Sequence, residues 1–114
     1  MHELAVTESI LEIALKHARQ AGASRVSDIY LVIGKLSSII DDSVQFYWEM
    51  IAEGSICDHA RLHFQSIPAR MKCNQCGLEF EMLDRLNPCP DCASIQLTII
   101  AGEEFFVESI AIEK

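Results

Sequence analysis

Four of the five cysteines stand in two pairs, "CNQC" at 73–76 and "CPDC" at 89–92, with the spacing C-x2-C-x12-C-x2-C. Two residues between paired cysteines let both sulfurs reach one ion from a single tight turn. The longer gap suits a hairpin that brings the two turns together. Four thiolates at the corners of a tetrahedron are the ligand set of a closed structural Zn²⁺ site. We therefore predict a structural zinc ion bound by Cys73, Cys76, Cys89 and Cys92.

The same cysteines are compatible with other chemistry. Iron takes the same tetrahedral set of four sulfurs, as in a rubredoxin-like electron carrier, and ligand type alone does not separate it from zinc. A redox dithiol or disulfides are further alternatives, although an odd number of cysteines argues against complete pairing. Four ligands leave no open position on the ion, so we expect no catalysis there. The stretch around the cysteines is turn-rich and poor in large apolar side chains, so metal binding would supply its stability.

The first three residues, Met1, His2 and Glu3, form a second candidate metal site. A free terminal amine, the amide nitrogens that follow it and the imidazole of His2 can form a planar set of nitrogen ligands. Such a set suits Ni²⁺ or Cu²⁺, and the Glu3 carboxylate offers an oxygen for an octahedral alternative. From chemistry alone, a His after the initiator Met also occurs by chance.

The fifth cysteine, Cys57, has an ordinary interpretation as a small buried apolar residue at the start of a strand. A site made of Cys57, His59 and His63 is conceivable, but the geometry of that segment is unproven. We expect His17 to lie on the solvated edge of a helix.

Helices and strands must position these groups. Apolar residues recur at helical spacing over residues 4–20. Ser9 and Glu12 match a capping box, although Thr7 or a residue further upstream could start this helix instead. A second helix is predicted over 44–53, capped by Asp42 or Ser43. β-Branched and aromatic residues predict strands at 26–35, 61–67, 96–101 and 105–112. This order predicts an α+β fold, with two helices on a small β-sheet and an inserted zinc-ribbon-like domain. We expect the last strand to return to the main sheet.

The composition and motifs of the chain argue against several classes of function. The 114-residue chain carries 17 acidic and 9 basic residues, for a net charge of −8, which disfavours nucleic acid as a partner. We find no transmembrane stretch and no secretory signal, and therefore expect a cytoplasmic protein. We also find no nucleophile–base pair and no phosphate-binding glycine loop, so we do not expect an enzyme.

Several motifs together resemble the HypA/HybF family of hydrogenase maturation factors, which are nickel-insertion accessory proteins. These are "MHE" before an amphipathic helix, "IGKLSSI" before a helix with a Trp, the paired cysteines, and "GEEFFVESIAIE" near the end. The resemblance spans essentially the whole chain. It implies a nickel-binding domain at 1–70 plus 105–114 and a zinc-binding domain at 71–104. Ala93, which follows the last cysteine, departs from the usual Gly or His.

The resemblance also implies ligands and partners. His2 would be the principal ligand of a transient Ni(II), with contributions from Met1 and Glu3 and with Asp41 as a further candidate, while zinc stays structural. The protein would be a nickel metallochaperone that works with a nickel-handling GTPase. It would deliver nickel to the large subunit of nickel–iron hydrogenase, and in some organisms to urease maturation proteins, as a monomer or homodimer. The alternative is a zinc-ribbon interaction module without a nickel function.

Overall fold

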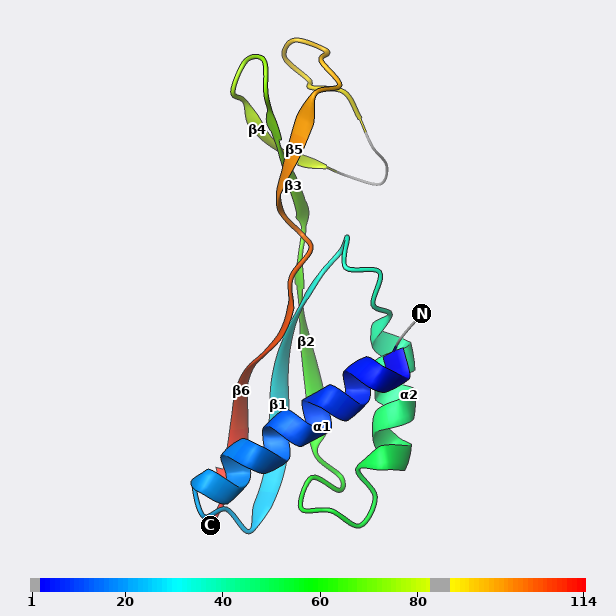
Figure 1. The fold of residues 1–114 in the computed structure, drawn as a ribbon, viewed down its shortest axis with the longest axis vertical. Helices are drawn as coiled ribbons and strands as arrows, with labels where there is room; N and C mark the ends of the chain where they lie inside the picture. Colours follow the sequence, from blue (N-terminus) through cyan, green and yellow to red (C-terminus); the bar gives the residue numbers. More distant parts are fainter. Residues whose placement is uncertain (1–2, 83–86) are drawn as a thin grey trace. The chain divides into compact units, whose positions relative to one another are not determined.

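The computed structural model of the chain describes residues 3–82 and 87–114 (Figure 1). Its strands form two three-stranded sheets, ordered β2-β1-β6 and β4-β3-β5. This confirms the predicted α+β class, and the pairing of β6 with β1 confirms that the last strand returns to the main sheet. The elements along the chain are α1 (Glu3–Gln20), β1 (Arg25–Gly34), α2 (Asp41–Ile51), β2 (Arg61–Ile67), β3 (Ala69–Cys73), β4 (Glu79–Met82), β5 (Leu97–Ala101) and β6 (Phe105–Glu113).

The chain divides into two compact units. The first unit holds the described residues up to Val32, together with Ser38–Gln65 and Phe106–Lys114. The second unit holds Ile33–Ser37 and the described part of Ser66–Phe105, including all four paired cysteines.

In the first unit, α1 crosses one face of the sheet (Figure 1). Its buried side is formed by small and medium side chains at helical spacing, including Thr7, Ile10, Ala14 and Ala18. Leu4 is exposed although it belongs to an apolar stripe of the sequence, because the alanines rather than the leucines lie at the centre of the contact. Ser9 forms no capping box; its hydroxyl donates to the Ala5 carbonyl oxygen inside the helix (3.2 Å). Among the described residues, neither helix combines the length and apolar character that a membrane span requires.

The second helix begins earlier than its sequence pattern predicts. It starts at Asp41, and neither Asp42 nor Ser43 is the N-cap; that position belongs to Ile40. Val44 and Trp48 are buried against the core, and burying side chains of this size contributes roughly 1.5–3 kcal/mol each.

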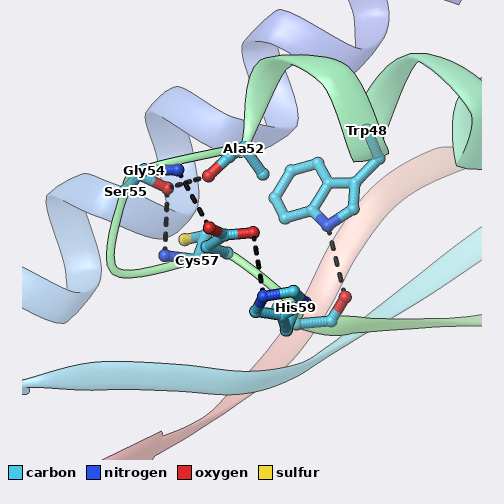
Figure 2. A network of polar contacts seen from close by, with 8 residues as sticks. Trp48, Ala52, Gly54, Ser55, Cys57 and His59 are labelled. Atoms are coloured by element: carbon cyan, nitrogen blue, oxygen red, sulfur yellow. Dashed lines mark hydrogen bonds and ion pairs between the residues drawn. The ribbon is translucent and has the colours of Figure 1, made fainter.

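The loop after α2 is a hydrogen-bonded network (Figure 2). The indole N–H of Trp48 donates to the carbonyl oxygen of Ala60 (3.3 Å), which ties α2 to the segment that enters β2. The Ser55 hydroxyl donates to the Ala52 carbonyl oxygen (2.7 Å) and accepts from the backbone N–H of Cys57 (3.0 Å). The Cys57 thiol is fully buried, in agreement with its interpretation as a small core residue.

In the second unit, β3 pairs with β4 on one side and β5 on the other, both antiparallel. The sequence pattern predicts no strand between 67 and 96, and so misses both β3 and β4; β4 has only the four residues "EFEM" and shows no extended apolar pattern. The apolar core is small: Ala69, Met71 and Met82 are buried, with Phe80 and Leu97 packed against them.

Two glycines allow backbone segments of the second unit to come close together. A Cβ on Gly34 would lie 2.0 Å from the carbonyl oxygen of Gly102. Gly102 itself has a φ of +112°, and a Cβ there would lie 2.7 Å from the Cα of Ala69. The N–H of Leu36 donates to that Gly102 carbonyl oxygen (2.7 Å), so the close approach is stabilised by a hydrogen bond.

Candidate metal centres

The two cysteine pairs lie on turns of the same design. In the first turn, the N–H of Gly77 donates to the carbonyl oxygen of Cys73 (2.9 Å). In the second, the N–H of Ala93 donates to the carbonyl oxygen of Cys89 (2.8 Å). Both residues have positive φ, +81° for Gly77 and +62° for Ala93. A left-handed conformation costs a residue with a Cβ roughly 1–2 kcal/mol, which explains why Gly is more usual at the position of Ala93.

The four cysteine sulfurs converge on one point. All of them lie within 4.8 Å of one another. The shortest separations join the two turns, at 3.5 Å between Cys73 and Cys92 and 3.6 Å between Cys76 and Cys89. A tetrahedral ion with metal–sulfur bonds of ~2.3 Å places neighbouring sulfurs about 3.8 Å apart, so the cluster fits one tetrahedral ion.

The cluster combines buried and exposed ligands. Cys73 and Cys89 are buried, whereas Cys76 and Cys92 are exposed, and all four are free thiols rather than disulfides. The sulfur–sulfur separations of 3.5 and 3.6 Å exceed the ~2.0 Å of a disulfide bond. The donor set therefore suits zinc in a closed site, close to the surface of the second unit.

The thiols influence one another's protonation. The backbone N–H of Cys76 points at the sulfur of Cys73 (3.5 Å) and is the main reason that the pKa of Cys73 falls to about 6. The N–H of Leu78 also acts to lower the pKa of Cys76, but desolvation and the neighbouring thiols outweigh it and raise that pKa to about 12. Thiols this close titrate as one set, so ionising one of them opposes ionising the next. A divalent cation removes this conflict because it stabilises all four thiolates.

The predicted amino-terminal site is described only in part. Met1 and His2 lie outside the described residues. Glu3 is the first residue of α1 and is nearly buried, with 9% of its surface exposed. Its carboxylate oxygen Oε2 accepts a hydrogen bond from the backbone N–H of Ile40 (3.3 Å). Asp41, the next residue, is exposed at the start of α2. The fold thus brings Glu3 into contact with the residue before Asp41.

Cys57, His59 and His63 do not form a metal site. The Cys57 thiol is buried, whereas the His59 side chain is 85% exposed and lies 3.7 Å from the Asp58 carboxylate. The imidazole of His63 contacts the carboxylate of Asp28 instead. Within the part of the chain that the structure describes, the four paired cysteines form the only group of three or more metal-ligating side chains close enough to share an ion.

Sequence reasoning missed a polar cluster on the sheet of the first unit. The imidazole of His63 on β2 lies 2.7 Å from the carboxylate of Asp28 on β1 and stacks on the ring of Tyr30. The His63 imidazole, followed by the Ser27 hydroxyl, holds the pKa of the Asp28 carboxyl below its ordinary value. The alternation of β1 and β2 placed these side chains on one face, but only the pairing of the strands brings them together.

A known protein family and several known proteins match this chain over nearly its whole length. Residues 1–112 match a family described as "Hydrogenase/urease nickel incorporation, metallochaperone, hypA". A hydrogenase maturation factor HypA from Dehalococcoides mccartyi (strain BAV1) is 40% identical over 113 residues, which cover 99% of this chain and 95% of the relative. The corresponding factor from Chlorobium limicola is 36% identical, over 100% and 98% of the two chains.

Solved structures agree in fold. The solution structure of the Ni metallochaperone HypA from Helicobacter pylori superposes with a TM-score of 0.69 at 23% identity, covering 99% of this chain and 98% of that one. A second solution structure, of a HypA protein, gives a TM-score of 0.73 at 24% identity, with coverage of 98% and 96%.

Proposed function

The chain belongs to the HypA family of nickel metallochaperones, and on that premise we propose that it binds Ni(II) at its amino terminus for delivery to the large subunit of a nickel–iron hydrogenase. The match of the family over residues 1–112 carries the proposal, because this range includes both "MHE" and the four cysteines. The family consists of metallochaperones and maturation factors rather than catalysts.

In the proposed nickel site, His2 is the principal ligand. The terminal amine of Met1, the amide nitrogens and the His2 imidazole supply nitrogen donors, with Glu3 contributing a further donor and Asp41 a carboxylate. Nitrogen-rich planar coordination suits Ni²⁺. A partner protein can remove an ion from a chain end without unfolding the body, and a carrier must release its cargo.

In the proposed zinc site, Cys73, Cys76, Cys89 and Cys92 hold a permanent ion. The convergence of their sulfurs within 4.8 Å supports this assignment. We assign the nickel domain to residues 1–70 plus 105–114 and the zinc domain to residues 71–104. Zinc would stabilise the second domain, whose apolar core is small.

The partners follow from family membership. We propose that the protein works in the cytoplasm with a nickel-handling GTPase and the hydrogenase large subunit, and in some organisms with urease maturation proteins. The net charge of −8 supports a role in handling cations and docking to proteins rather than binding nucleic acid.

Nickel titration of the zinc-loaded protein beside His2→Ala tests this function. We expect stoichiometric nickel binding to be lost in the variant, because the imidazole and the chelate ring that it closes are gone, while zinc content and helix content stay unchanged. His17→Ala is the matched control, since His17 is exposed on α1 and should leave nickel binding intact. Retention of nickel affinity by His2→Ala would refute the proposed site.

A further inference from the structure

An open cavity of about 710 Å³ lies between α2 and the segment that leads into β2. Gln45 and Glu49 line it from α2, and Arg61 and His63 line it from β2. Trp48 and His59, which Figure 2 shows at close range, also line it. All of the lining residues belong to the first unit, so the cavity is a feature of that unit alone.

The lining of this cavity is predominantly acidic. It contains three carboxylates, from Glu49, Glu53 and Asp58, and one guanidinium, from Arg61. The carboxylate of Glu49 accepts from the Gln45 amide (3.1 Å), and that of Asp58 accepts from a backbone N–H (3.0 Å), but neither contact removes the negative charge. In residues 3–82 and 87–114, neither Glu49 nor Glu53 forms an ion pair with a basic side chain. The cavity therefore offers negative charge to a ligand.

Exposed apolar side chains adjoin the cavity on α2. Phe46 is 62% exposed and Met50 is 54% exposed. Positions three and four apart are neighbours on a helix surface, so Phe46, Glu49 and Met50 lie side by side. Methionine adapts to the shape of a ligand, and both aromatic residues and methionine are enriched at protein interfaces. Together with Glu53 and Asp58, these three side chains define a surface that we call the acidic–apolar surface.

The chemistry of the acidic–apolar surface narrows the kind of ligand. A metal ion is disfavoured, because among the described residues only the paired cysteines bring three or more donor groups together. Nucleic acid and other polyanions would be repelled by the carboxylates. A second copy of the chain is poorly complementary, since it carries 17 acidic residues against 9 basic ones. A ligand with both basic and apolar side chains matches the charge of the cavity and the exposed Phe46 and Met50.

We propose that the acidic–apolar surface is a docking site for a basic, amphipathic segment of a partner protein. Lysine or arginine side chains of that segment enter the cavity and pair with Glu49, Glu53 and Asp58, and its apolar side chains cover Phe46 and Met50. The carboxylates steer the approach and select the partner, while burial of the apolar side chains adds affinity. The surface contains none of the proposed nickel or zinc ligands, so this inference goes beyond the proposed function.

A synthetic amphipathic peptide made only of leucine and lysine is the probe, and the same peptide with glutamate in place of lysine is its control. We expect the lysine peptide to bind the zinc-loaded protein and to change the fluorescence of Trp48, the single tryptophan, which lines the cavity. The glutamate peptide should not bind. Amide chemical shifts should change within residues 45–63 and stay constant in β3–β5. Added salt should weaken binding, because it screens the attraction.

Substitutions test the charged part of the surface. Glu49→Lys should weaken binding of the lysine peptide about tenfold, because it replaces an attraction by a repulsion at the cavity. Glu12→Lys is the matched control, since it makes the same change in net charge at an exposed position of α1 that does not line the cavity. The control should change the affinity by no more than about twofold, because salt screens distant charges.

The apolar part is tested in the same way. Phe46→Ala should weaken binding of the lysine peptide about fivefold, as expected for truncation of an aromatic side chain at an interface. Ile13→Ala removes an exposed apolar side chain from α1 and should leave the affinity unchanged. Circular dichroism and zinc content of each variant establish that the fold is retained.

Several results would overturn the inference. Equal weakening by Glu49→Lys and Glu12→Lys would mean that net charge alone attracts the peptide. Binding of the glutamate peptide, or of neither peptide, would also contradict a basic ligand. If sedimentation of the peptide-free protein reveals a dimer that Phe46→Ala dissociates, a second copy covers this surface instead. Nickel titration of Glu49→Lys should match that of the native protein, so failure of the docking site is distinguishable from failure of the nickel function.

Discussion

At the scale of single residues, specific contacts with neighbouring groups position the side chains that could do chemistry. The cysteine sulfurs are aimed by turns in which Gly77 and Ala93 adopt left-handed conformations. Glu3 accepts from Ile40, and His63 contacts Asp28 on the neighbouring strand. In each case, a backbone group or a neighbouring strand determines where the chemistry-bearing side chain lies.

The Asp28–His63 pair predicts a specific acid sensitivity. The pKa of Asp28 is lowered in the folded protein, so its contribution to stability is present above the ordinary carboxyl value of 3.8 and is lost as the pH falls through the lowered folded value. Asp28→Asn should therefore lower the urea midpoint at neutral pH, and the difference from the native protein should shrink in strong acid. Fluorescence of Trp48, the single tryptophan, reports on this unit.

A double-mutant cycle tests whether His63 is the partner through which Asp28 stabilises the fold. In a His63→Gln background, Asp28→Asn should have a smaller effect, because the pair has already been broken. If the difference in urea midpoint between Asp28→Asn and the native protein persists undiminished below the lowered pKa of Asp28, the charged carboxylate is not what stabilises the fold here.

Residue type and spacing were sufficient to predict that the four cysteines form one cluster, and the fold brings their sulfurs together. The contact of Glu3 could not be predicted, since its partner is a backbone N–H 37 residues away and depends on how the helices pack. The Asp28–His63 contact was missed for the same reason: it needs the register of two strands.

At the scale of elements, two hydrogen bonds attach α2 to the rest of the first unit. Its start receives the Glu3 carboxylate, and its Trp48 is buried and bonded to Ala60. Sequence periodicity located both helices and the longer strands. It misplaced the start of α2 because Asp42 and Ser43 are good capping residues locally, whereas the N-cap is Ile40, whose N–H donates to Glu3 on α1. It missed β3 and β4 because strands of five and four residues have too few positions for alternation to identify them.

Trp48→Phe should destabilise the first unit by about 2–3 kcal/mol. The change removes the indole N–H, leaves the Ala60 carbonyl oxygen without this donor and opens space in the core. Urea unfolding followed by circular dichroism measures the loss. Phe46→Leu is the control on the same helix, because Phe46 is exposed and its substitution should change stability by no more than about 0.5 kcal/mol. Equal stability of Trp48→Phe and native protein would mean that this bond and packing do not hold α2.

At the scale of the whole molecule, the chain combines two units with different sources of stability. The first buries large apolar side chains, including Ile10, Ile29, Leu31, Val44 and Trp48. The second has a small core and a set of converging cysteines. Apparent zinc binding energies of roughly 10–16 kcal/mol are large enough to decide whether such a unit folds.

Loss of one zinc ligand should therefore affect the two units differently. Cys73→Ala should abolish zinc binding and make β3–β5 susceptible to proteolysis, while Trp48 fluorescence stays native. Cys57→Ala is the control, because it removes a thiol outside the cluster and should leave zinc content unchanged. Survival of zinc binding and protease resistance in Cys73→Ala would contradict the tetrathiolate site.

The most direct test of the nickel assignment compares nickel titrations of zinc-loaded protein with its free amino terminus and with an amino-terminal tag. A tag converts the terminal amine into an amide and keeps every side chain, including the four cysteines. We expect the tag to weaken nickel binding as strongly as His2→Ala does, with zinc unchanged in both. Equal nickel affinity in the tagged and untagged proteins would remove the amine from the ligand set and contradict the planar nitrogen site proposed here.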